Sequence, residues 1–142
     1  MRERALGYLS RREYSRQELQ KKLKAYVVDE DLNALLDDFQ TRGWLSESRY
    51  VEQMIHARQA KFGSLKVAHE LRNHGVAEEL IDSAIVALRV DEKERAGNLW
   101  RKKFGTVAKG REEWAKQARF LQSRGFDTDT IKAVLRGEPE DE

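Results

Sequence analysis

Residues 63–76, GSLKVAHELRNHGV, contain the pattern on which the rest of the chain is built. Ser64 is a candidate N-cap directly after a glycine, because its hydroxyl can accept a hydrogen bond from a free backbone N–H of the first helical turn. Val67 and Leu71 are four residues apart and therefore share one face of the predicted helix. Gly75 follows at the point where helices commonly end in a left-handed residue. The stretch predicts a short amphipathic helix between two glycine corners.

The flanking segments 49–62 and 77–88 also have helical apolar spacing, so the repeating unit is predicted to contain three helices. Apolar positions recur every 48 to 50 residues, at Leu23, Leu71 and Leu121 and at Leu32, Ile81 and Ile131. A unit of this size buries too little surface to be stable alone, so neighbouring units should stack.

The predicted fold class is therefore all-α, with three tandem three-helix repeats that form an elongated, curved array. The repeats are assigned to residues 1–45, 46–90 and 91–136, and residues 137–142 to a disordered acidic tail. The first repeat has Val27 at the position where the other two have a glycine corner.

Local signals predict where several helices begin and end. A first helix is expected over residues 2–14. Ser15 and Glu18 have the spacing of a capping box, in which each side chain satisfies a free backbone N–H near the helix start. Residues 91–94, DEKE, form a similar start pattern, and Asp127 is a candidate cap for the last helix.

The composition indicates a helix-rich, strongly solvated chain. Of its 142 residues, 39% are apolar, 37% are charged and one is proline. It has no cysteine, which excludes disulfides and cysteine-bound metal. No apolar run approaches the ~20 residues of a membrane-spanning helix, and the N-terminus leads into no signal-peptide core. A soluble cytosolic protein is predicted.

The net charge of +2 conceals alternating blocks of opposite sign. Residues 1–28 carry eight basic and three acidic side chains, whereas residues 29–48 carry one and six. Residues 95–136 are basic again, with eleven basic and four acidic side chains. The alternation suggests a basic face and an acidic face on the folded array.

The basic side chains are the candidates for contact with a partner, either acidic protein surface or phosphates. The alternative is an ordinary solvated helix face, since lysine and arginine are mostly exposed in any protein. Arg58 interrupts an apolar stripe and either lies over the core or reaches a partner. Arg124 also has a structural alternative, since a cation near a helix C-terminus offsets the helix dipole. The candidate set is Arg11, Arg12, Arg16, Lys21, Lys22, Lys24, Arg58, Lys66, Arg72, Arg101, Lys102, Lys103, Lys116, Arg119 and Arg124.

Other residue types give weaker functional signals. Trp44, Trp100 and Trp114 could stack on bases, but their positions beside apolar stripes favour packing. His69 and His74 are five residues apart and do not share a helix face, so they make no metal-binding pair. No glycine-rich phosphate loop and no nucleophile–base set is recognisable. The chain is predicted to hold no metal and no cofactor and to catalyse no reaction.

Four ordered motifs carry a resemblance to a known family. They are REYSxxELxxKL at 12–23, GWLSESRY at 43–50, GSxxxxxELRxxGV at 63–76 and FLxxRGF at 120–126. Together they resemble the RecX family of bacterial regulators over roughly residues 5–136. Val27 and the pair Ser46 and Glu47 depart from the family pattern in the first repeat and its joint.

The resemblance implies a cytoplasmic protein that binds the RecA recombinase, particularly the RecA–single-stranded DNA filament. It implies inhibition or modulation of recombinase, ATPase and co-protease activities, in the setting of DNA recombination, DNA repair and the SOS response. The alternative from a different class is a sequence-independent DNA-binding helical module that acts without RecA, with a helix presented to DNA. Under either hypothesis we expect a monomer that is not an enzyme.

Overall fold

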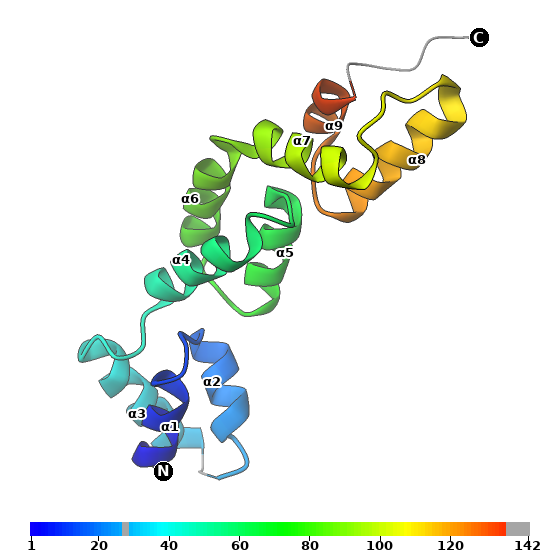
Figure 1. Cartoon of the computed structure of the whole chain (residues 1–142). Coiled ribbons are helices and arrows are strands. Elements are labelled where there is room, and N and C mark those ends of the chain that lie inside the picture. Colours follow the sequence, from blue (N-terminus) through cyan, green and yellow to red (C-terminus); the bar gives the residue numbers. More distant parts are fainter. Residues whose placement is uncertain (27–28, 136–142) are drawn as a thin grey trace.

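The computed structural model describes residues 1–26 and 29–135, and this part of the chain is entirely helical (Figure 1). Its helices are α1 (Arg2–Leu9), α2 (Arg16–Leu23), α3 (Asp29–Thr41), α4 (Glu47–Arg58), α5 (Ser64–Asn73), α6 (Glu78–Arg89), α7 (Glu92–Lys103), α8 (Gly110–Ser123) and α9 (Thr128–Val134). They form three units of three helices arranged end to end, so the molecule is elongated (Figure 1). The predicted all-α fold of tandem three-helix repeats is confirmed. The corner at Val27 and the tail at 137–142 lie outside the described residues.

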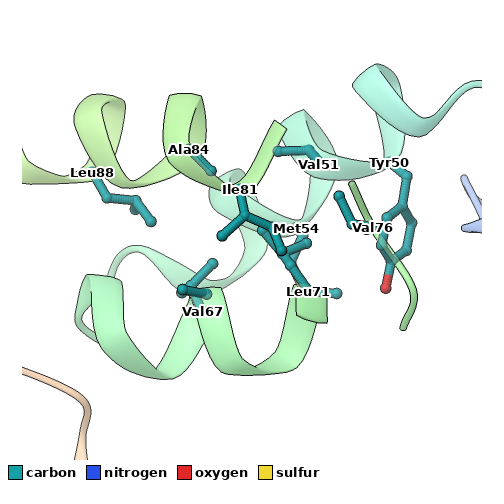
Figure 2. Packing of buried hydrophobic residues seen from close by; sticks show 10 residues of the cluster. Tyr50, Val51, Met54, Val67, Leu71, Val76, Ile81, Ala84 and Leu88 are labelled. Carbon is teal, nitrogen blue, oxygen red and sulfur yellow. The ribbon is translucent and has the colours of Figure 1, made fainter. Parts of the chain in front are cut away.

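Each unit has a hydrophobic core of its own, because the apolar stripes of its three helices face one another. The core of α1–α3 contains Ala5, Tyr14, Leu19, Leu23, Leu32, Leu36, Phe39 and Leu45. The core of α4–α6 contains Tyr50, Val51, Met54, Val67, Ala68, Leu71, Val76, Ile81, Ala84 and Leu88 (Figure 2). The core of α7–α9 is smaller and contains Ala96, Leu121, Phe126, Ile131 and Leu135. These cores include all six apolar positions that recur along the sequence, which are Leu23, Leu71, Leu121, Leu32, Ile81 and Ile131.

Several helix ends follow the local signals in the sequence. The hydroxyl of Ser15 accepts the N–H of Glu18 at 3.1 Å, and the Glu18 carboxylate accepts the N–H of Ser15 at 3.1 Å, which completes the predicted capping box. Asp127 caps α9 by accepting the N–H of Thr130 at 2.8 Å. Gly75 ends α5 with φ +77°, the left-handed conformation that glycine adopts without steric cost.

The first predicted helix end is wrong, because α1 stops at Leu9 and does not continue to residue 14. The hydroxyl of Ser10 donates to the carbonyl oxygen of Gly7 at 2.7 Å, and the N–H of Arg11 donates to the carbonyl oxygen of Tyr8 at 3.0 Å. Such local bonds turn the backbone out of the helix. The turn brings Tyr14 into the core of the first unit.

Two predicted caps are also wrong. Gly63, not Ser64, is the N-cap of α5, and the hydroxyl of Ser64 donates instead to Glu92 at 3.1 Å. Asp91 occupies the N-cap position of α7 without a side-chain capping bond, because its carboxylate pairs with Arg95 at 2.9 Å. In both cases the predicted capping side chain bonds to another residue. Ser64 bonds to Glu92 of the next unit, and Asp91 bonds to Arg95 one turn further along its own helix.

The second and third units are joined directly through their backbones. The N–H of Gly63 donates to the carbonyl oxygen of Arg124 at 2.8 Å, and the N–H of Leu65 donates to the carbonyl oxygen of Gly125 at 3.1 Å. A Cβ atom on Gly63 would lie 2.4 Å from the carbonyl oxygen of Gly125. The two backbone segments therefore approach more closely than a side chain at this position would permit. The α4–α5 corner and the α8–α9 corner therefore form one continuous contact.

Two buried charged residues reinforce this joint. The Glu92 carboxylate accepts the N–H of Ser64 at 2.5 Å, so it caps a helix of the neighbouring unit. The Arg95 guanidinium donates to the carbonyl oxygens of Gln59, Phe62 and Leu88 at 2.6, 3.0 and 2.6 Å. The bonds to Gln59 and Leu88 satisfy carbonyls at the ends of α4 and α6, and the bond to Phe62 satisfies one in the loop between α4 and α5.

The first and second units are connected through side chains. The Glu47 carboxylate accepts the N–H of Arg16 at 2.6 Å, Gln53 accepts the N–H of Glu13 at 3.1 Å, and Arg49 pairs with Glu13 at 2.9 Å. Burial raises the pKa of the Glu47 carboxyl, although the N–H of Arg16 opposes this effect. Within residues 1–26 and 29–135, no backbone-to-backbone hydrogen bond crosses this joint.

Candidate partner-binding surface

Three adjoining hollows form a groove that starts at α2, crosses the joint between the first two units and continues between α4 and α5. Their volumes are about 200, 450 and 430 Å³, and each shares lining residues with the next. Arg12, Glu18 and His74 line the first two, and Arg58, Glu70 and His74 line the last two. We call this surface the joint groove. Its lining includes Arg12, Tyr14, Gln17, Glu18, Lys21, Lys22, Tyr50, Gln53, Met54, Ala57, Arg58, Phe62, Lys66, His69, Glu70, Asn73 and His74.

Two arginine–glutamate pairs define the charge of the joint groove. Arg58 contacts the Glu70 carboxylate through two nitrogens at 3.0 and 3.1 Å, and Arg12 contacts the Glu18 carboxylate at 3.3 Å through two nitrogens. The hydrogen bond from Arg58 is the main reason why the pKa of Glu70 lies below its usual value. Glu70 is therefore an anion at neutral pH, and arginine and glutamate side chains alternate along the groove.

Tyr50 and His74 form the wall of the groove at the joint itself. The Tyr50 hydroxyl and Nδ1 of His74 share a hydrogen bond, and the same nitrogen lies 3.7 Å from the Glu18 carboxylate of the first unit. Burial, followed by the nearby carboxylates of Glu18 and Glu70, raises the pKa of Tyr50 far above its usual value, so its hydroxyl stays protonated. His74 thus connects the two units across the groove.

The structure brings five of the fifteen candidate cations together and separates the rest. Arg12, Lys21, Lys22, Arg58 and Lys66 line the joint groove. Arg16 is bound by Asp37 at 2.6 Å within the first unit, and Arg72 is bound by Glu78 at 2.8 Å within the second. Lys116 lines a separate hollow of about 330 Å³ between Phe104 and Gln117 in the third unit. The candidate set is therefore distributed over several surfaces.

Many of these cations lie over aromatic rings of the molecule itself. The distances to the ring centroids are 3.6 Å from Arg12 to Tyr14, 4.8 Å from Lys22 to Tyr8, 4.7 Å from Lys66 to Phe62, 5.8 Å from Lys103 to Phe120, and 5.6 and 5.2 Å from Arg124 to Phe62 and Phe120. Such cation–π contacts hold the charges at fixed places on the surface. Arg101 is held by Asn98.

Six candidates form neither an ion pair nor a ring contact with any residue that the structure describes. They are Arg11, Lys21 and Lys24 in the first unit and Lys102, Lys116 and Arg119 in the third. Their ammonium or guanidinium groups are available to external anions. The first three lie on the first unit and the last three on the third, which are the two outer units of the elongated molecule (Figure 1).

The sequence did not single out Tyr50, Gln53 and Met54 as lining of a groove, and it did not pair Arg58 with Glu70. A usable signal exists for the pair, since the two residues are twelve apart on either side of the corner at Gly63. Helices α4 and α5 meet at this corner and contact each other, which brings the two positions together. No comparable signal exists for His74 and Glu18, which belong to different units.

Residues 1–26 and 29–135 contain no group of three histidine, aspartate or glutamate side chains placed to hold a metal ion. In the same residues, no helix is both long and apolar enough to cross a membrane.

The three units of three helices define the class of protein: an all-helical repeat protein. Family models described as the first, second and third three-helix domains of RecX match residues 2–32, 46–85 and 91–135. The chain belongs to the RecX family. This is a family of regulatory proteins and not a known enzyme family, and the resemblance noted in the sequence is confirmed.

Curated relatives named Regulatory protein RecX align over nearly the whole chain. The relative from Leptothrix cholodnii is 46% identical over 134 residues, which cover 94% of this chain and 85% of the relative. The relative from Herminiimonas arsenicoxydans is 41% identical over 140 residues, covering 98% and 93%. The crystal structure of RecX from Lactobacillus salivarius superposes with a TM-score of 0.81 at 18% identity, covering 95% of this chain and 92% of that one. That structural likeness supports the fold.

Proposed function

We propose that this protein binds the RecA–single-stranded DNA filament in the bacterial cytoplasm and lowers the recombinase, ATPase and co-protease activities of RecA. The observation that carries the proposal is the match of all three repeats, in order, to the three RecX domains. RecA regulation is the function that membership in this family implies. The protein acts by binding, without a reaction of its own.

The elongated shape supports a mechanism based on lateral contact. Three units in a row can touch more than one protomer of a filament, so binding would restrain the movement of neighbouring protomers during the ATPase cycle. The six unpaired cations on the two outer units add attraction toward acidic protein surface and DNA phosphates, which accelerates association.

The decisive experiment measures DNA-dependent ATP hydrolysis by RecA with and without this protein. We expect turnover to fall at stoichiometric amounts. A Lys102→Glu, Lys116→Glu, Arg119→Glu variant should inhibit less, whereas Lys93→Glu, on the same unit but outside the candidate set, should inhibit like the parent. Unchanged turnover with the parent protein would overturn the proposal.

The six unpaired cations also favour a second candidate, a DNA-binding module that acts without RecA. Binding to phosphates releases counterions, so affinity for bare DNA would fall steeply with salt. Fluorescence anisotropy with single- and double-stranded oligonucleotides separates the two functions. Tight binding to bare DNA favours the module, whereas weak binding that RecA strengthens favours the filament regulator.

A further inference from the structure

The joint groove has the features of a binding site for a protein segment. We propose that it binds an extended stretch of the protein partner that carries a carboxylate next to a large apolar side chain. In this complex Arg58 binds the carboxylate, while the apolar side chain lies on the floor formed by Met54 and Ala57. The inference rests on the proposed function, because it names the chemistry by which the filament's protein component would be recognised.

The floor between α4 and α5 supplies the apolar part of the site. Met54 is buried and Ala57 is exposed, so an incoming side chain can cover apolar surface that water now reaches at Ala57. The hollow along this floor has a volume of about 450 Å³ and adjoins the one of about 430 Å³, and both fall in the size range of typical ligand sites. Ala57 is the position where the floor lacks a large side chain of its own.

Arg58 supplies the charged part of the site. A guanidinium has five N–H donors, and Arg58 directs its Nε and one Nη2 donor to Glu70. Its side chain is 39% exposed, so the remaining donors face the open groove. A partner carboxylate can therefore bind Arg58 while Glu70 holds the guanidinium in position. The contact gains strength when the apolar neighbour excludes water from it.

The same groove is poorly suited to single-stranded nucleic acid. Proteins bind such strands by stacking bases on open aromatic faces. Here the rings near the groove already have cations over them: Arg12 over Tyr14, and Lys66 and Arg124 over Phe62. A protein segment with an acidic and an apolar side chain fits the surface better.

The test uses binding to preassembled RecA–single-stranded DNA filaments, measured by biolayer interferometry. Ala57→Trp fills the floor and should weaken binding at least tenfold. Ala87→Trp places the same side chain on the exposed face of α6 and should bind like the parent. Thermal unfolding of each variant verifies that it is folded.

A charge swap separates recognition from a purely structural role of the ion pair. Arg58→Glu should weaken binding, and the double variant Arg58→Glu, Glu70→Arg should stay weak even though it restores a pair of opposite charges. Glu79→Arg, on the exposed surface of α6, controls for the added positive charge. Recovery of parental binding by the swap would show that the pair only maintains the fold, which overturns the inference.

The outcomes distinguish the inference from the proposed function. If the parent protein does not bind the filament, the proposed function fails and the groove assignment fails with it. If the parent binds while Ala57→Trp and the swap bind equally well, the groove assignment fails and the proposed function stands. If the groove variants lose affinity for a bare single-stranded oligonucleotide by the same factor, the occupant is nucleic acid and the assignment is overturned.

Discussion

Glu92 is a buried carboxylate whose role is to complete a helix in the neighbouring unit. It is 3% exposed and accepts the N–H and the hydroxyl of Ser64. Removal of one partner leaves buried donors unsatisfied, and hydrogen bonds to charged groups contribute about 1.5–3 kcal/mol. We predict that Glu92→Ala lowers the free energy of unfolding by about 2 kcal/mol in urea denaturation. Glu94→Ala, exposed on the same helix, should change it by less than about 0.5 kcal/mol. Equal effects would contradict the capping role.

Gly125 is required by both its backbone conformation and its surroundings. Its φ is +93°, and a Cβ atom there would lie 2.4 Å from Cβ of Lys66. Gly43 provides a matched control, since its φ is +78° but nothing lies within 4 Å of its added Cβ. A left-handed residue with a side chain costs roughly 1–2 kcal/mol. We predict that Gly43→Ala loses about that amount in chemical denaturation and that Gly125→Ala loses clearly more. A similar loss for both variants would show that the second joint can relax.

Helix α9 depends on its cap because it is the shortest helix of the array, with seven residues. The N–H of Thr130 is the main reason why the pKa of Asp127 lies below its usual value, and Arg89 of the second unit adds to this effect at 3.4 Å. A lowered pKa means that the stabilisation is present above the ordinary value of about 3.9 and is lost as pH falls through the lower folded value. We predict that Asp127→Ala lowers the free energy of unfolding by about 1 kcal/mol at pH 7. The gap in unfolding free energy between variant and parent should shrink below about pH 4. Urea denaturation at a series of pH values measures this gap, and a gap that stays constant down to pH 2 would refute the role of the Asp127 carboxylate.

Helix α5 holds the middle core through Leu71, which is fully buried. Truncation of a buried leucine costs roughly 2–5 kcal/mol. We predict that Leu71→Ala lowers the free energy of unfolding by an amount in this range. It should destabilise more of the chain than Leu135→Ala does, because both outer units pack against the middle one. Leu135 is 8% exposed and belongs to the smaller third core. Hydrogen exchange should show loss of protection in all three units for Leu71→Ala and mainly in α7–α9 for Leu135→Ala. Equal destabilisation would argue against coupled units.

The whole molecule combines two joints of different construction. Two backbone hydrogen bonds, Glu92 and Arg95 tie the second unit to the third, whereas side chains connect the first unit to the second. We predict that the first unit moves relative to the other two, which move together. The chain has no cysteine, so single cysteines can be introduced cleanly at exposed positions. Spin labels at Lys24→Cys and Ala87→Cys should give a wider distance distribution in double electron–electron resonance than labels at Ala87→Cys and Gln122→Cys. Equal widths would contradict the difference between the joints.

Motion at the first joint matters because the joint groove crosses it. Arg12 and Glu18 lie on one side of the joint, and Arg58 and Glu70 lie on the other. A segment bound in the groove would contact both units and restrict their relative movement. The groove proposal therefore predicts that partner binding and the shape of the array are coupled.

The parts of the fold that depend on neighbouring residues could be predicted from the sequence. The apolar spacing around Leu71 and its recurrence predicted the units, and Ser15 with Glu18 predicted a helix start, because stripes and capping boxes involve residues within one helical turn. The prediction that Ser64 is an N-cap was wrong because its partner is distant in the sequence. Its hydroxyl bonds Glu92, which is 28 residues away, and no local rule includes such a partner.

For the candidate site, the sequence indicated which residues are basic but not which of them are available. Arg16 and Arg72 are bound within their own units, whereas Lys21 and Lys116 are not. Whether a surface cation has a partner depends on where other helices place their carboxylates. The groove itself also depends on packing, because its walls come from α2, α4 and α5.

The order of the amino acids was therefore sufficient to predict the repeat and the core positions, since both depend on periodic patterns along the chain, and its ordered motifs carried the resemblance to the family. The tertiary structure decided what residues 63–76 do beyond forming a helix. In the folded chain Ser64 bonds to Glu92, the α4–α5 corner packs against Gly125, and Glu70 pairs with Arg58. These contacts join segments that lie 12 to 62 residues apart, and their geometry arises when the helices stack and bring distant backbones within hydrogen-bonding distance.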